Sequence, residues 1–343
     1  MTQTTIQGPN PAGTQVVAPE NPVKKLLSNQ QFILLVVWIA MVVVFTLLNR
    51  IFFSVGVAEN ILADWGPLVL IACGELFVVI SGGIDLSVGA VVGFSGVISA
   101  LVMKSMYSSG ISAWPTLAVG IGVCIGVGLL IGLINSLLIN YARLVPFIAT
   151  LVTLGACSGL SLVITKGAPI MGGPPEAIAL SPAWIGPFSK PVLVVIVIVG
   201  VLWAFLHKAR FGRYTYALGS NPFATRAAGI NVKRHIAKVY MLSGALAGLA
   251  GFFFYLRLGG GSPTSGYGSE LDAIAAVVIG GAALTGGVGR ISGTVLGALI
   301  LTTVTSGLII VGVDPQWKRV VVAVLIAIAA TLQALRKTEG GAS

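Results

Sequence analysis

The sequence predicts an all-α polytopic membrane protein of about ten transmembrane helices, with both termini in the cytoplasm. Of its 343 residues, 56% are hydrophobic and only 9% are charged, and its mean hydropathy is +1.00. A soluble domain usually carries about 25% charged residues. The chain also contains a series of apolar stretches of membrane-spanning length. Between two of them lies one basic segment, residues 208–238, with seven Lys and Arg residues and no acid.

Ten apolar stretches approach the roughly 20 residues that a helix needs to cross a bilayer. We expect spans near 32–52, 61–80, 84–103, 115–138, 145–165, 190–207, 238–257, 272–288, 291–312 and 317–335. An even number of spans puts both termini on one side. With the amino terminus inside, the cytoplasmic segments carry thirteen basic and two acidic residues, and the outer segments carry seven and six. Basic residues are retained in the cytoplasm, which favours this orientation.

The predicted domain organisation is simple. Residues 1–30 are polar, contain four prolines and are expected to form a flexible cytoplasmic tail. Residues 31–337 form a single transmembrane domain, and residues 338–343 form a second tail. The three cysteines, Cys73, Cys124 and Cys157, fall in apolar stretches without metal-site spacing, so they are expected to be core residues. No cofactor, metal or nucleic-acid partner is expected.

The basic segment contains a short helix with its own start and stop signals. Asn221 can cap the free amides of the first turn, and Pro222 fits the first helical position. Gly229 can adopt the left-handed conformation that ends a helix. A two-turn helix on the cytoplasmic side of a membrane-embedded chain indicates a contact point for another protein. Its residues are Asn221, Pro222, Phe223, Ala224, Thr225, Arg226, Ala227, Ala228 and Gly229.

Two carboxylates lie at membrane depth. Asp85 follows Gly82 and Gly83, and it is expected either to cap the next helix by accepting the amide of Val88 or to line a translocation path or gate. Glu75 lies in the middle of the second span, where it is either functional or protonated and hydrogen-bonded to a neighbouring helix. A continuous helix would separate the two by roughly 15 Å, which argues against a catalytic pair.

Other features bear on packing and on the outer surface. Asn135, near the end of the fourth span, is expected to join helices by hydrogen bonding. The 45 glycines, among them Gly128 and Gly244, predict close helix packing. Val78–Gly83 resembles Val277–Gly281, which is weak evidence for an internal repeat. The loop 259–272 is expected to be either solvated or a docking rim for an extracytoplasmic partner.

Enzyme motifs are absent from the sequence, and so is a phosphate-binding loop, so any ATP hydrolysis would take place on another subunit.

Several runs in order then resemble a known family. They are GGIDLSVG at 82–89, VPFIATLVTLG at 145–155, GRYTYALGSNPFATRAAGINV at 212–232, ELDAIAAVVIGGAALTGGVGRISGT at 270–294 and GALIL at 297–301. Together they resemble the ribose-type permeases of bacterial ABC importers, within the branched-chain amino acid and sugar permease superfamily, over roughly residues 32–335.

The resemblance implies a multi-pass subunit of the bacterial inner membrane that dimerises with itself or a paralogue. It implies a separate cytoplasmic ATPase and a periplasmic sugar-binding protein as partners, with a monosaccharide or small polyol as cargo. By similarity, residues 221–229 are the coupling helix that docks on the ATPase. The residues expected at the translocation path or gate are Glu75, Gly82, Gly83, Asp85, Ser87 and Asn135.

A second hypothesis also fits the residues. Glu75 and Asp85 could carry protons in a secondary transporter. The capped helix favours the ATP-driven alternative, because a proton-coupled carrier has no need of a rigid cytoplasmic contact. Neither hypothesis identifies the sugar.

Overall fold

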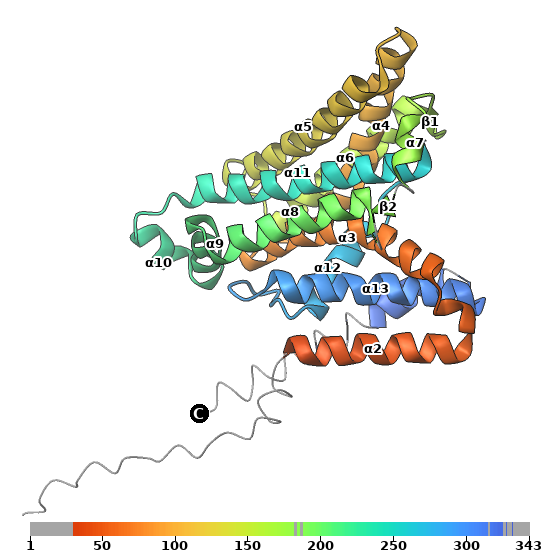
Figure 1. Cartoon of the computed structure of the whole chain (residues 1–343). Coiled ribbons are helices and arrows are strands. Elements are labelled where there is room, and N and C mark those ends of the chain that lie inside the picture. Colours follow the sequence, from red (N-terminus) through yellow and green to blue (C-terminus); the bar gives the residue numbers. More distant parts are fainter. Residues whose placement is uncertain are drawn as a thin grey trace, which may run out of the picture.

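The computed structural model describes residues 30–181, 184–185, 188–314, 316–324, 327 and 331, and this part is mostly helical. Figure 1 shows the long helices side by side, with α9 and α10 at one end of the bundle and α7 with β1 at the other. The elements are α2 (Gln30–Leu48), η1 (Arg50–Phe52), α3 (Val55–Ile80), α4 (Val88–Ser108), α5 (Ala113–Asn140), α6 (Pro146–Thr165), β1 (Ile170–Met171), α7 (Glu176–Leu180), β2 (Trp184–Ile185), β3 (Phe188–Ser189), α8 (Lys190–His207), α9 (Arg210–Ser220), α10 (Pro222–Ala227), α11 (Val232–Leu258), β4 (Gly260–Gly261), α12 (Ser269–Ile279) and α13 (Ile291–Val311). β1 pairs with β4, and β2 with β3, both antiparallel.

Eight helices of the described residues are long and apolar enough to cross a membrane, which confirms the all-α polytopic class. The predicted span 190–207 coincides with α8, whereas α3 and α11 each begin six residues earlier than expected. The predicted span 317–335 is helical over residues 317–324, and most of the rest lies outside the described residues. The two predicted tails also lie outside them, apart from Gln30. The sidedness of the termini therefore stays a prediction.

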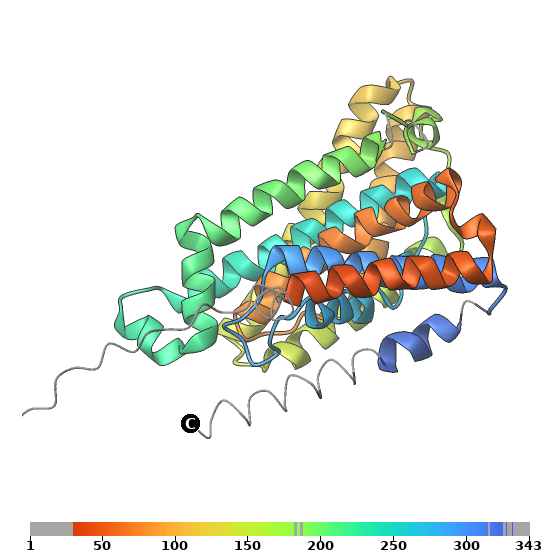
Figure 2. The same cartoon turned by 60° about the horizontal axis from the view of Figure 1, so that its bottom comes forward.

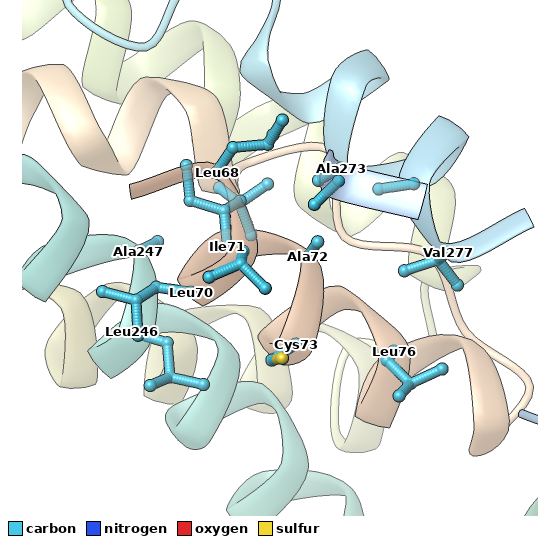
Figure 3. Close-up of a cluster of buried hydrophobic side chains, with 14 of the residues drawn as sticks. Leu68, Leu70, Ile71, Ala72, Cys73, Leu76, Leu246, Ala247, Ala273 and Val277 are labelled. Carbon is cyan, nitrogen blue, oxygen red and sulfur yellow. The ribbon is translucent and has the colours of Figure 1, made fainter. Parts of the chain in front are cut away.

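Helix α3 forms the centre of the bundle. Every residue from Trp65 to Ile80 is buried, and the surrounding helices include α11, α12, α13 and α8. In Figure 3 its side chains meet those of α11 on one side and α12 on the other, among them Leu70, Ala72 and Leu76 of α3, Leu246 and Ala247 of α11, and Ala273 and Val277 of α12. Because a membrane supplies no aqueous face, a helix apolar all round can be buried in this way.

Helix α2 lies at the edge of the bundle along α13 (Figure 2). Polar side chains hold it there, because Trp38 Nε1 donates to Thr303 Oγ1 at 3.0 Å and Asn49 Nδ2 donates to the carbonyl of Ile310 at 3.0 Å. Within α2 itself, Leu34 is the one buried residue. The exposed apolar side chains of α2, among them Val36, Ile39 and Val43, are therefore available to contact lipid.

Helices α5 and α11 cross at a contact made by glycines. A Cβ atom on Gly128 would overlap the carbonyl oxygen of Gly244, and one on Gly244 would overlap the carbonyl oxygen of Gly128. Gly248 lies equally close to the carbonyl oxygen of Cys124. The predicted close packing is confirmed here. It does not extend to all glycines of α5, because a Cβ on Gly122 or Gly126 would meet no described atom within 4 Å.

The predicted span 272–288 is wrong as a continuous helix. Helix α12 has 11 residues, Ser269–Ile279, and at 1.5 Å per residue it is roughly 16 Å long, about half the thickness of a bilayer core. The chain after it is rich in glycine, and Gly281, Gly286 and Gly287 all have positive φ, a conformation that ends helices. Residues 272–288 are apolar enough to predict a span, because hydropathy alone does not detect turns made by glycine.

The two similar segments, Val78–Gly83 and Val277–Gly281, have the same backbone geometry. After α3, the amides of Gly82 and Gly83 donate to the carbonyls of Val79 and Val78 at 2.9 and 3.0 Å. After α12, the amides of Gly281 and Ala282 donate to Val278 and Val277 at 3.0 and 3.1 Å. With φ of +86° at Gly82 and +90° at Gly281, both ends form the Schellman motif. The two turns that follow α3 and α12 are thus structurally equivalent.

These turns meet each other and the end of α9. The amide of Gly287 donates to the carbonyl of Ile80 at 2.9 Å. Gly219, near the end of α9, packs so closely that a Cβ atom there would overlap the carbonyl oxygen of Ile80. We call this contact, made by Ile80, Gly82, Gly219, Gly286 and Gly287, the glycine junction. It connects the segment that carries α10 to the turns after α3 and α12.

Candidate functional site

Helix α10 has the ends that the sequence predicts. Asn221 Oδ1 accepts the amides of Phe223 and Ala224, both at 3.0 Å. Pro222 occupies the first helical position. Gly229 has φ of +80°, so it is the left-handed residue just beyond the helix. All three predicted features of this helix are confirmed.

The exposed surface of α10 is suited to binding another protein. Phe223 is 82% exposed, and Arg226 is exposed on the same short helix. Thr225 is the buried member of the segment, and its hydroxyl donates to the carbonyl of Asn221 at 2.8 Å. The other exposed residues are Asn221, Pro222, Ala224, Ala227, Ala228 and Gly229. Phe and Arg are both residue types enriched at protein interfaces relative to the rest of the surface.

The basic segment 208–238 is more ordered than a loop. It contains α9 and α10, and residues 232–238 form the first two turns of α11. Sequence reasoning missed α9, although Gly212, Thr215 and Leu218 are spaced three apart and form its buried face. The hydroxyl of Thr215 lies 3.0 Å from Nε2 of the buried His235 on α11. Helix α10 is therefore supported by α9, which is itself anchored to α11.

The second predicted set comes together as a buried polar network around the turn after α3. Asp85 Oδ1 accepts from the amide of Ser87 at 3.0 Å and from its hydroxyl at 2.5 Å. Asp85 Oδ2 accepts from the hydroxyl of Ser243 on α11 at 3.0 Å. The expected acceptance of the Val88 amide is wrong, because the carboxylate instead closes a tighter turn two residues ahead. Asp85 thus ties this turn to a neighbouring helix.

Asn135 extends the network to two more helices. Its Nδ2 donates to the hydroxyl of Ser87 at 2.8 Å, and its Oδ1 accepts from the hydroxyl of Thr153 on α6 at 2.6 Å. The prediction that Asn135 joins helices by hydrogen bonding is confirmed. Thr153 and Ser243 were not predicted, because single hydroxyl residues in apolar stretches give no distinct signal in a sequence.

Glu75 and Asp85 are close in space, so the separation of roughly 15 Å expected for a continuous helix is wrong. Helix α3 ends at Ile80, and the chain turns back so that the amide of Asp85 donates to Glu75 Oε1 at 3.1 Å. Both side chains are buried, with 0% and 1% exposure. Among the described residues, Glu75 Oε2 and the hydroxyl of Tyr240 have no hydrogen-bond partner. Helix capping does not account for a buried carboxylate oxygen without a partner.

Six residues were predicted at a path or gate. Four of them, Glu75, Asp85, Ser87 and Asn135, belong to the network, and all four are buried. Gly82 and Gly83 form the turn that brings Asp85 back to Glu75. Their assignment to a path or gate stays a prediction.

Two substitutions at Asp85 should differ in effect. Asp85→Asn keeps an oxygen that can accept the Ser87 amide, and its new amide group can donate to the Ser243 hydroxyl. Asp85→Leu leaves both partners unsatisfied in the interior, at about 1–3 kcal/mol for each buried group. We expect substrate uptake by Asp85→Asn to remain measurable and uptake by Asp85→Leu to be much lower. Equal and complete loss of uptake in both variants would instead show that the ionised carboxylate is required.

The chain was compared with known proteins. Residues 57–330 match the family described as "Branched-chain amino acid transport system / permease component". The chain is 38% identical over 309 residues to the ribose import permease protein RbsC of Escherichia coli K12, covering 89% of this chain and 92% of that protein. It is 42% identical over 294 residues to RbsC of Bacillus subtilis 168, covering 85% and 89%.

A third relative is the D-allose transport system permease protein AlsC of Escherichia coli K12, which is 38% identical over 267 residues, covering 78% of this chain and 80% of that protein. No solved structure matches the chain. The relatives are permeases, and eight apolar helices of the described residues can cross a membrane. The chain therefore belongs to the family of branched-chain amino acid transport system permease components, and it is a transport component of the inner membrane rather than an enzyme.

Proposed function

We propose that this protein is the transmembrane subunit of a bacterial ABC importer for a monosaccharide or similar small polyol. The observation that carries the proposal is α10, an exposed and doubly capped helix on a support of α9 and α11. Relatives named for ribose and allose transport support a sugar as the cargo. In this proposal a cytoplasmic ATPase binds α10, a periplasmic binding protein delivers the sugar, and two permease subunits form the complete pathway.

The mechanical route from α10 runs through the glycine junction. When the ATPase moves α10, α9 moves with it. Gly219 of α9 is packed against the carbonyl of Ile80, so it displaces that carbonyl. Ile80 precedes the turn that holds Asp85, and it is hydrogen-bonded to the turn after α12 through Gly287. A displacement at α10 therefore reaches both structurally equivalent turns. Packed interfaces of this kind convert small shifts into discrete changes of state.

Within this scheme the buried network controls the pathway rather than forming its wall. Glu75, Asp85 and Asn135 each have 0–1% exposure, and a side chain enclosed by its own subunit cannot touch a substrate that passes between two subunits. We assign the six predicted residues to a gate whose closed position the network stabilises. A turn held by hydrogen bonds to α5, α6 and α11 can move only when several of these bonds change together.

The main alternative is a proton-coupled secondary transporter. The observation that favours it is the pair of buried carboxylates, one of which has an oxygen without a partner in the described structure. Intramembrane carboxylates of this kind often carry protons. This candidate predicts transport without an ATPase.

Reconstitution separates the two functions. Proteoliposomes would contain the permease and its ATPase, with ribose-loaded binding protein outside and ATP inside. We expect labelled ribose to accumulate with ATP, to stop with a hydrolysis-deficient ATPase and to persist with an uncoupler. Accumulation that survives ATP removal and collapses with the uncoupler would establish the proton-coupled alternative. Ribose, allose and galactose should each be tested with their own binding proteins.

A further inference from the structure

We propose that a cavity at the end of α11 remote from α10 is a binding site for the monosaccharide before it crosses the membrane. This inference rests on the proposed function. The cavity has a volume of about 530 Å³, within the range of roughly 300–1,000 Å³ typical of small-molecule sites. Its walls come from α3, α11, α12, α13, the loop after α11 and Lys318.

The loop after α11 shapes this cavity because it folds inward. Gly260, Gly261 and Gly266 are buried, and a Cβ on Gly93 of α4 would overlap the backbone of this loop at Ser265. The expected solvated loop therefore holds only in part, because these glycines are buried whereas Thr264 and Tyr267 are exposed. The loop lies against α4 and places its hydroxyl groups beside the other helices.

The cavity is lined by two ion pairs whose charges cancel. Arg257 pairs with Asp64, and Lys318 Nζ lies 2.7 Å from Asp272 Oδ2. A carboxylate can accept about four hydrogen bonds and a guanidinium can donate five, so one contact within each pair leaves many sites for a ligand. A wall with two acids and two bases attracts neither anions nor cations strongly. This balance favours a neutral ligand with several hydroxyl groups.

Hydroxyl and apolar side chains complete the same surface. The hydroxyl groups belong to Ser262, Thr264, Ser265, Tyr267, Ser269, Thr302 and Thr305. The buried Ser265 Oγ has no hydrogen-bond partner among the described residues. Apolar contact is offered by Leu68, Phe254 and Leu258. A sugar presents both hydroxyl groups and C–H faces, so it matches this mixture of donors, acceptors and apolar surface.

The location fits the delivery of sugar from outside. Helix α11 begins beside α10 and ends at the cavity, and its 27 residues span roughly 40 Å, more than the thickness of a bilayer core. Figure 1 shows α10 at the opposite end of α11 from β1, whose partner β4 directly follows α11. On α3 the lining residues end at Ile71, one helical turn before Glu75. The cavity therefore lies next to the proposed gate.

Cysteine protection tests the site in the complete transporter. The native cysteines Cys73, Cys124 and Cys157 are buried, with 0–1% exposure, so background labelling by a maleimide added from outside should be low. We expect labelling of Thr305→Cys to slow several-fold as D-ribose is raised. Ser112→Cys, exposed at the start of α5 outside the cavity, should label at the same rate throughout. Absence of protection, or failure of the reagent to reach Thr305→Cys, would overturn the assignment.

A transport measurement distinguishes this inference from the function on which it rests. Thr305→Val removes a hydroxyl group from the cavity, whereas Thr294→Val removes one from the same helix outside it. At saturating ribose-loaded binding protein, we expect Thr305→Val to transport several-fold more slowly and Thr294→Val to match the wild type. No ATP-dependent uptake of ribose, allose or galactose by the wild type would refute the proposed function. Normal uptake by Thr305→Val without ribose protection would refute the cavity alone.

Discussion

Phe223→Asp combined with Arg226→Glu is expected to abolish association with the ATPase while leaving the permease folded. Both side chains are exposed, so their replacement removes no internal packing. An interface hot spot contributes about 2 kcal/mol or more, and the loss of two would weaken binding by roughly three orders of magnitude. The measurement is co-purification of the ATPase with tagged permease, together with size-exclusion chromatography of the permease alone.

A matched control lies on the neighbouring turn. Tyr141→Asp with Arg143→Glu makes the same chemical change at exposed positions just after α5. Asn140 is held to the carbonyl of Lys233 at the start of α11, so this turn lies on the same face as α10. We expect the control to retain the ATPase. Recovery of a normal amount of ATPase with the α10 double variant would mean that α10 is not the coupling helix.

Gly244→Leu should prevent the bundle from folding. At this position even a Cβ atom would overlap the backbone of Gly128, so a larger side chain must force α5 and α11 apart. Overpacking a core typically costs about 1–3 kcal/mol and occasionally more, and a whole leucine side chain against the backbone of another helix is an extreme case. The expected result is loss of a monodisperse species in detergent and a large fall in yield.

Two glycines of α5 provide the control for that prediction. A Cβ at Gly122 or Gly126 would meet no described atom within 4 Å, so leucine should fit at either position. Leucine also favours helix over glycine by roughly 1 kcal/mol, and the variants should be at least as stable as the parent. If Gly126→Leu were as damaging as Gly244→Leu, the crossing would not be the cause of the defect.

The sequence predicted α10 more accurately than the other parts of the candidate site. Its caps depend on the side chain of Asn221, which accepts amides two and three residues ahead, and on the positive φ that Gly229 can adopt. The fold class also followed from composition, since 9% charged residues is far below the roughly 25% that is typical of soluble domains. Capping signals act over a few consecutive residues, and composition is an average over the whole chain. Neither therefore depends on which helices pack together.

The failures arose where tertiary contacts decide the outcome. A straight helix would separate Glu75 and Asp85 by roughly 15 Å. The turn at Gly82 instead brings them into contact. The window 272–288 was apolar enough for a span, yet its glycines end α12 at Ile279. Likewise, nothing in the sequence distinguishes Gly128, which makes the helix crossing, from Gly126, which faces away from it.

The hydrogen bond between Gly287 and Ile80 has an energetic consequence. A single backbone hydrogen bond contributes a net free energy of about 0.5–1.5 kcal/mol, only a little above the thermal energy of roughly 0.6 kcal/mol at room temperature. The close backbone contacts of Gly219 and Gly286 at the same junction add to this bond, so the two turns are expected to separate only when the whole junction shifts. A movement of α9 would therefore be passed to both turns together, because the junction yields as one unit.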